Sequence, residues 1–305
     1  LAMTLPPGST FKLVTAAAAL ESGKYVADSQ LPGPTEINLP GTDVQLGNWS
    51  GKSCGAGDVT TLQAALEISC NTAFAWLGME LGADAIDEQA KKFGFESEFS
   101  VPMTSAISRF PVDPNKPQTA MSAIGQFDVR ATVLQMAMVA AGIANDGVVM
   151  NPYLVSQVLG SNGGVLYEGK PQTQEVFAAD VIADLTYSLT KVVTGGTGGA
   201  ALSLGRPAAG KTGTSQSNAS AWFSAYTPQL AASVALFRDN ASQSLNGIGG
   251  LTSVTGGTFP ARIWAAFMKG ALKGEPVLNF PAPSNIGGLD PIVMTSGGVQ
   301  VYKRK

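Results

Sequence analysis

The sequence predicts an α+β fold: a helical block, then antiparallel strands, then a closing helix. Helical apolar patterns dominate the first 144 residues, and after Val148 they give way to short strand-like runs bounded by glycine. A last helical pattern precedes a tail rich in proline and glycine. Because helices and strands fall in successive blocks, we expect an antiparallel sheet flanked by helices, plus an all-helical lobe.

The first expected helix covers residues 10–22, between the breaker Pro6-Pro7-Gly8 and Gly23. Its apolar side chains surround nearly the whole circumference, which is typical of a central, buried helix. Residues 31–58 are rich in Pro, Gly and Asn and predict loops or short strands. Further helices are expected over residues 61–68, 71–81, 83–93 and 130–144.

The second half should contain a hairpin and three further strands. Residues 153–158 and 164–167 flank Ser161-Asn162-Gly163, a turn sequence. A helix is expected over residues 179–193, strands over 210–214, 221–226 and 231–238, and a final helix over 261–272. We take residues 1–273 as one domain and 274–305 as a tail. In the tail, residues 292–295 and 299–302 predict a second hairpin around Ser296-Gly297-Gly298.

Composition narrows the function classes. The 305 residues can bury a large core, and a charged fraction of 13% with net charge −3 disfavours disorder and nucleic-acid binding. No apolar run approaches the roughly 20 residues that span a bilayer, so we expect any export signal or membrane anchor to lie outside these residues.

Histidine is absent, which excludes Ser-His-Asp triads and histidine-ligated zinc. A nucleophile must therefore be activated by another base, and lysine is the obvious candidate.

Three motifs follow one another in the order Ser-x-x-Lys, Ser-x-Asn and Lys-Thr-Gly. They begin at Ser9, Ser69 and Lys211. Ser9 lies on the first turn of the buried helix, where free N–H groups favour a developing negative charge. Lys12 lies on the same face one turn later. The set therefore predicts a serine nucleophile with a lysine base.

A base must be uncharged, and burial together with the like charge of Lys211 would lower the pKa of Lys12. A fall from about 10.4 to about 7 corresponds to roughly 4 to 5 kcal/mol, which a desolvated site can supply. Ser69 could relay a proton to the leaving amine, and the amide of Asn71 could hold Lys12 and a substrate carbonyl. The alternative is that Ser69 and Asn71 only cap a helix and that Ser9 and Lys12 are an ordinary helix start.

A nucleotide site is a rival interpretation of the third motif. Residues 205–212 match the phosphate-binding pattern G-x-x-x-x-G-K-[ST], and an apolar run could end in a magnesium-binding Asp239. Such a loop must run from a strand into a helix, but strand-like sequence follows Thr212. The glycine-rich residues 195–199 could cradle a phosphate, and a flexible connection is the plainer interpretation.

Together the motifs of this chain resemble the transpeptidase domain of penicillin-binding proteins, and the front half is most similar to class B enzymes of actinobacterial type. Residues 255–281 are more similar to the end of class A enzymes, so the class stays open. The resemblance implies the penicillin-binding/β-lactamase-like fold, in which two strands normally precede the Ser-x-x-Lys helix. This chain starts too late to contain them. We therefore expect an exposed edge strand and predict that the tail hairpin covers it.

The resemblance implies a D,D-transpeptidase that cross-links peptidoglycan stem peptides through an acyl-serine and that β-lactams acylate. The catalytic residues would be Ser9, Lys12, Ser69, Asn71 and Lys211. The N–H groups of Ser9 and Thr214 would form the oxyanion hole. Thr212, Thr214 and Lys211 would bind the substrate carboxylate, and a side chain at Gly213 would obstruct the cleft. No metal or cofactor is implied, and the protein would act at the extracytoplasmic face of the cell membrane.

Other functions use the same fold. A class A β-lactamase would need a deacylating Glu, and residues 99–111 contain none. A D,D-carboxypeptidase or a non-catalytic β-lactam sensor would need the same acylating residues, so the sequence leaves both open.

Cys54 and Cys70 are the two cysteines of the chain. They could be two buried thiols, or they could form a disulfide between the glycine-rich loop at residues 51–57 and the Ser69 turn. Both alternatives stay open, because a sequence does not show the distance between two Cα atoms.

Overall fold

The helical lobe is built around α1 (Lys12–Glu21), which follows directly on the 3₁₀ turn η1 (Gly8–Phe11). The computed structural model describes residues 1–99, 101, 103–287, 292–295 and 298–301. Residues 12–20 of α1 are all buried, as the apolar circumference predicts. At its start, Phe11 packs against the rings of Phe95 and Phe110.

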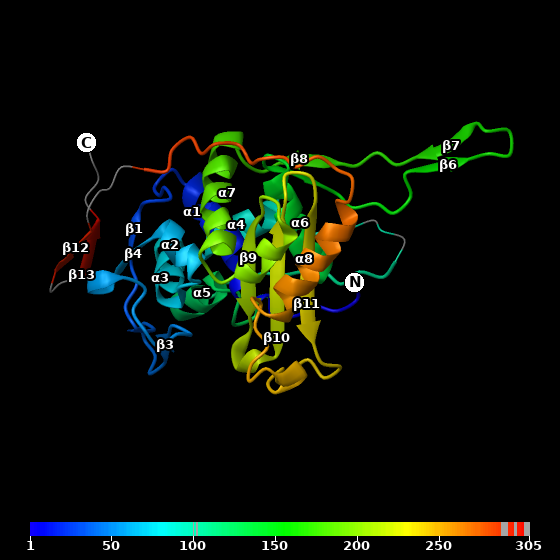
Figure 1. Cartoon of the computed structure of the whole chain (residues 1–305). Helices are drawn as coiled ribbons and strands as arrows, with labels where there is room; N and C mark the ends of the chain where they lie inside the picture. Colours follow the sequence, from blue (N-terminus) through cyan, green and yellow to red (C-terminus); the bar gives the residue numbers. More distant parts are fainter. Residues whose placement is uncertain (100, 102, 288–291, 296–297, 302–305) are drawn as a thin grey trace.

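Further helices surround α1 (Figure 1). Their bounds are α2 (Leu62–Glu67), α3 (Asn71–Leu81), α4 (Ala83–Lys92), α5 (Lys116–Ala123), α6 (Val133–Ala144) and α7 (Ala179–Thr194). Among them, α3, α4 and α7 pack directly on α1. Most were predicted to within a few residues. The sequence analysis missed α5, which starts with an Asn115 capping box and carries a proline in its first turn.

The main sheet has three antiparallel strands, in the order β11 (Ala231–Phe237), β10 (Ser220–Tyr226), β9 (Ala209–Thr214). β10 is buried along its whole length because both faces of the sheet are covered. Trp222 and Tyr226 join the core that includes α6, whereas Phe223 packs edge-on against Trp264 of α8 (Phe259–Ala271). The predicted α+β fold is confirmed.

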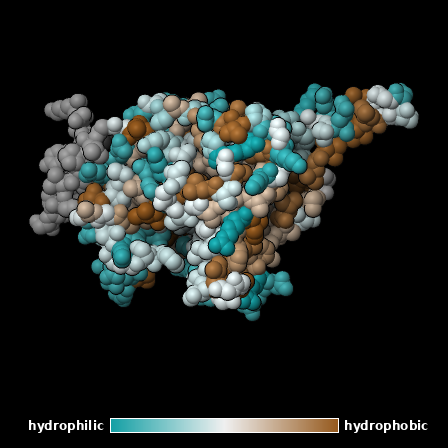
Figure 2. Space-filling model, in the orientation of Figure 1, coloured by the Kyte–Doolittle hydropathy of each residue, from teal (hydrophilic) through white to brown (hydrophobic). Residues whose placement is uncertain are grey.

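Short strands form small antiparallel pairs outside the main sheet. β1 (Gln30–Pro32) pairs with β4 (Val59–Thr61), β2 (Glu36–Asn38) with β3 (Gln45–Gly47), and β5 (Val148–Met150) with β8 (Thr173–Glu175). β6 (Gln157–Leu159) and β7 (Val165–Glu168) form the first predicted hairpin, which projects from the body as a narrow arm (Figure 1). Apolar side chains lie along this arm (Figure 2), and Leu166 is 74% exposed.

The tail hairpin forms, but its predicted position is wrong. β12 (Ile292–Thr295) pairs with β13 (Gly298–Val301) in a separate sheet, so it does not extend the main sheet beyond β11. The reason lies upstream, where the buried carboxylate of Asp184 on α7 accepts hydrogen bonds from the backbone N–H groups of Ser284 and Asn285. These bonds direct the tail across α7 toward β1, on the far side of the molecule from β11 (Figure 1).

Across the described ranges, every helix is too short or too polar to cross a bilayer.

Candidate active site

Ser9 lies on η1, where three backbone segments meet without side chains between them. Gly8 adopts the left-handed φ of +53°, and a Cβ there would lie 2.7 Å from the carbonyl oxygen of Thr214. A Cβ on Gly125 would lie 2.0 Å from the oxygen of Gly8, and one on Gly213 would lie 2.6 Å from that of Pro7. Glycine is therefore required at these contacts, because any larger residue would separate the turn that carries Ser9 from β9.

Lys12 is fully buried, and its amine reaches the Ser-x-Asn motif. Its Nζ donates to the Oδ1 of Asn71 at 2.9 Å and to the backbone oxygen of Ser69 at 2.8 Å, with the Oγ of Ser69 at 3.4 Å. Ser69 has a left-handed φ of +62° between α2 and α3. This conformation is strained for a residue with a Cβ, and it points the carbonyl of Ser69 at the lysine.

The electrostatics of the site favour uncharged lysines. Burial first, and then the nearby charge of Lys211, hold the pKa of Lys12 well below its ordinary value. Burial also lowers the pKa of Lys211 from 10.5 to about 7. Burial lowers both pKa values because a desolvated ammonium loses its hydration, and at Lys12 the like charge of Lys211 adds to this effect.

Lys211 lies in β9, with its Nζ 3.1 Å from the carbonyl oxygen of Thr212. β9 is an edge strand, and its hydrogen-bonded pairs with β10 include Ser215 with Ser220. Alternate residues therefore turn their N–H groups away from β10, and Thr212 and Thr214 are among them. On this side of the strand, the backbone of Thr214 lies against Gly8 of η1.

The glycine-rich residues 195–199 contact both the end of α2 and β9, a role that the sequence analysis did not identify. The Oγ1 of Thr197 lies 2.6 Å from that of Thr212, and the N–H of Thr197 donates to the carbonyl of Glu67 on α2. A Cβ on Gly196 would lie 2.2 Å from that carbonyl oxygen. The segment therefore joins the end of α2, next to Ser69, to the Lys-Thr-Gly strand.

The nucleotide interpretation of residues 205–212 is wrong. β9 continues through Thr214, and it is followed by the short 3₁₀ turn η4 (Gln216–Asn218) and then β10. A phosphate-binding loop would instead lead from a strand into a helix, whose N-terminus holds the phosphates.

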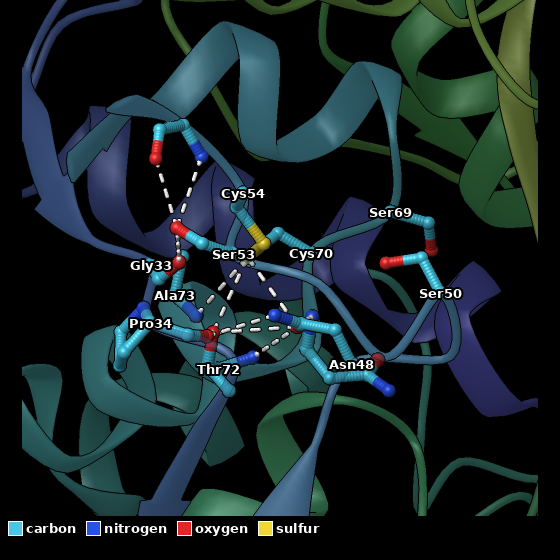
Figure 3. Close-up of a disulfide and its surroundings, with 12 residues drawn as sticks. Gly33, Pro34, Asn48, Ser50, Ser53, Cys54, Ser69, Cys70, Thr72 and Ala73 are labelled. Carbon is cyan, nitrogen blue, oxygen red and sulfur yellow. Dashed lines mark hydrogen bonds between the residues drawn. A yellow bond between two sulfur atoms is a disulfide. The ribbon is translucent and has the colours of Figure 1, made fainter. Parts of the chain in front are cut away.

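Cys54 and Cys70 are joined by a disulfide, with their Cα atoms 6.0 Å apart (Figure 3). The bond ties the loop at residues 47–54 to the Ser-x-Asn turn. Asn48 of that loop also contacts the turn (Figure 3), and no motif in the sequence indicated it.

The structure thus gathers residues from all three motifs, with Ser9 and Lys12 on adjoining elements and Lys12 in contact with Ser69 and Asn71. Lys211 is close enough to act on the charge of Lys12. In the part of the chain that the structure describes, no hydrogen bond joins the hydroxyl of Ser9 to either lysine. Such bonds in enzymes without substrate are often long and tighten only when substrate binds.

Known proteins are similar to this chain in both sequence and fold. The profile of the penicillin binding protein transpeptidase domain matches residues 1–252. The peptidoglycan D,D-transpeptidase PbpA of Mycobacterium tuberculosis is 36% identical over 284 residues, which cover 90% of this chain and 56% of the relative. The chain therefore spans about half the length of this curated relative. Penicillin-binding protein 1A of Mycolicibacterium smegmatis is 34% identical over 93% of this chain and 36% of its own length.

Solved structures agree. Penicillin-binding protein A of M. tuberculosis, as an imipenem acyl-enzyme complex, superimposes with a TM-score of 0.77 at 35% identity, over 89% of this chain and 61% of that one. PonA1 of M. tuberculosis, in complex with penicillin V, gives 0.79 at 27% identity, over 94% of this chain and 74% of that one. Sequence, fold and motif positions together show that the chain belongs to the family of penicillin-binding protein transpeptidase domains.

Proposed function

We propose that this chain is a D,D-transpeptidase that cross-links peptidoglycan stem peptides through an acyl-enzyme on Ser9. The observation that carries the proposal is the buried amine of Lys12, held by Ser69 and Asn71 beside a second buried lysine. An uncharged amine one helical turn from a serine can take up the hydroxyl proton, in a chain that contains no histidine.

In the first half-reaction, Lys12 takes the proton of the Ser9 hydroxyl as its oxygen attacks the carbonyl of the penultimate D-Ala. The peptide C–N bond breaks as Ser69 passes its proton to the leaving D-Ala amine and takes the proton held by Lys12, which leaves Lys12 uncharged again. In the second half-reaction, an amine of a neighbouring stem peptide attacks the acyl-serine. It loses a proton to the same relay, and the serine hydroxyl is restored.

The N–H groups of Ser9 and Thr214 would stabilise the tetrahedral oxyanion. The outward direction of the Thr214 N–H on the β9 edge supports this role. Lys211 and the hydroxyls of Thr212 and Thr214 would hold the terminal carboxylate of the substrate. The negative charge of that carboxylate would raise the pKa of Lys211 from about 7 and so favour its positively charged form.

β-Lactams would acylate Ser9 in place of the stem peptide. The imipenem, ceftriaxone and penicillin G acyl-enzymes of penicillin-binding protein A support this expectation. The substrate also implies a location outside the cytoplasm, where peptidoglycan is assembled. A disulfide between Cys54 and Cys70 suits such an oxidising compartment.

The test is intact mass after exposure to a labelled penicillin. We expect one adduct per chain in the wild type and none in Ser9→Ala. Ser22→Ala, at the far end of α1, serves as the matched control and should be acylated normally. An adduct that persists in Ser9→Ala would refute the site assignment.

Turnover separates the related functions. With a stem-peptide substrate and an amine acceptor, a transpeptidase releases D-Ala and forms the cross-linked product. Release of D-Ala without cross-linking would indicate a carboxypeptidase, and acylation by penicillin without any turnover would indicate a sensor.

A further inference from the structure

The Ser-x-Asn turn has an unusual helix start. The N-cap of α3 is Cys70, whose sulfur is in the disulfide and offers only a weak acceptor, 3.4 Å from the N–H of Ala73. The first N–H groups of a helix need acceptors, and capping side chains normally supply them with an oxygen. Asn71 and Thr72 therefore begin a helix without a local oxygen cap.

Asn48 supplies that acceptor from a different segment of the chain. Its Oδ1 accepts from the N–H of Asn71 at 2.9 Å and from the N–H of Thr72 at 3.1 Å. Its Nδ2 donates to the carbonyls of Pro34 at 2.8 Å and Lys52 at 2.9 Å. Figure 3 shows Asn48 close to Pro34, Cys70 and Thr72. One amide thus fixes the helix start and its own loop at the same time.

Asn71, whose backbone N–H binds Asn48, also binds the amine of Lys12 through its own side chain. The Oδ1 of Asn71 accepts from the Nζ of Lys12, and the preceding turn carries the strained Ser69 whose carbonyl also accepts from that amine. A backbone shift at Asn71 would therefore move two of the acceptors around Lys12. The disulfide holds the same turn at the N-cap itself, through Cys70.

We infer that Asn48 is a positioning residue for acylation, acting through the backbone of Asn71 to set the acceptors of Lys12. The inference rests on the proposed function, because it assigns Lys12 as the base. The acceptor oxygen is the essential atom, since it caps the helix that begins at the motif. The two donor bonds serve to aim that oxygen.

The experiment compares second-order rates of acylation by labelled penicillin. Asn48→Ala should slow acylation by about tenfold to a hundredfold, as expected when a reacting group is displaced. Asn48→Asp keeps the acceptor oxygen, but it replaces the Nδ2 donor by an oxygen that faces the carbonyls of Pro34 and Lys52. We therefore expect partial rescue, with acylation faster than in Asn48→Ala and slower than in the wild type. The pH profile of Asn48→Ala should also shift, because two acceptors of the Lys12 amine have moved.

Asn115→Ala is the matched control. Asn115 also caps a helix with its side-chain oxygen, accepting from the N–H of Gln118, but it is the local N-cap of α5, and α5 carries no motif. We expect this variant to lose stability while it is acylated at the wild-type rate. Rates are measured well below the unfolding temperature of each variant. If Asn48→Ala does not fold, Asn48→Gln replaces it, because the longer side chain displaces the same amide, and the same slowing is expected.

Wild-type acylation rates for Asn48→Ala, or equal slowing in Asn48→Asp and Asn48→Ala, would overturn the inference. A wild-type protein that penicillin does not acylate would instead overturn the proposed function, so the two failures are distinguishable.

Discussion

Replacing Lys211 by methionine should abolish acylation and yet make the folded protein more stable. Lys211 is fully buried, and its pKa falls from 10.5 to about 7 on folding. At pH 7 that difference costs the folded state about 4 kcal/mol. Loss of the bond from Lys211 to the carbonyl of Thr212 offsets about 1 kcal/mol of the gain. Methionine is unbranched and similar in length, so we expect a net stabilisation of about 3 kcal/mol.

The pH dependence identifies the cause. Below pH 7 the lysine is protonated in both states and the folded state bears the whole penalty, whereas above pH 10.5 it is neutral in both and none remains. The wild type should therefore gain stability as the pH rises through this window. At pH 9 the penalty is about 2 kcal/mol. The difference in free energy of unfolding between Lys211→Met and the wild type should therefore be about 2 kcal/mol smaller at pH 9 than at pH 7.

The assay is urea unfolding of the wild type and Lys211→Met at pH 7 and pH 9, with the free energy of unfolding extrapolated to water. Lys269→Met, on the exposed side of α8, controls for the substitution itself. A stability gap that stays the same at both pH values would refute the reasoning, because it would mean that Lys211 binds its proton equally well in the folded and unfolded chains.

Three further predictions concern the same site. Thr197→Val should slow acylation by labelled penicillin by about tenfold, because it removes the hydroxyl that contacts Thr212. Thr197→Ser keeps that hydroxyl and should stay within about twofold of the wild-type rate. Equal acylation rates in the two variants would contradict this prediction. Gly125→Ala should lower the free energy of unfolding by more than about 3 kcal/mol in urea, because its Cβ would meet a carbonyl oxygen at 2.0 Å. Gly41→Ala has a similar positive φ but open space around it and should cost about 1 kcal/mol, so equal losses would argue against the steric cause. In Ser9→Ala at pH 8, binding of a D-Ala-D-Ala peptide should take up about 0.9 proton, because Lys211 becomes charged when the peptide binds. The measurement is calorimetry in buffers of different ionisation enthalpy. A binding enthalpy that does not depend on the buffer would contradict this prediction.

Local patterns predicted much of the fold. α3 and α7 were found almost to the residue because each combines an apolar repeat with a glycine directly after its last residue. α5 was missed because its eight residues include a proline and few large apolar side chains. The pairs β1–β4 and β2–β3 have strands of three residues, too short for an alternation pattern to stand out.

The parts of the site that escaped prediction depend on contacts between distant segments. Asn48 reaches Asn71 across 23 positions, and Thr197 reaches Thr212 across 15. Neither residue type is unusual in a loop, so nothing local distinguishes them. The prediction of the tail's position failed for the same reason. The carboxylate of Asp184 binds the backbone of Ser284, which lies 100 residues further along the chain.

The glycine contacts around η1 limit how such a protein can become resistant to β-lactams. At Gly8, Gly125 and Gly213 the turn η1 that carries Ser9 is positioned by close main-chain contacts, and each glycine leaves no room for a side chain of its own. On the proposed function, any substitution there should slow acylation by the stem peptide as much as acylation by a β-lactam. Selection by antibiotics should therefore leave these three codons unchanged and act on side chains around the rim of the site.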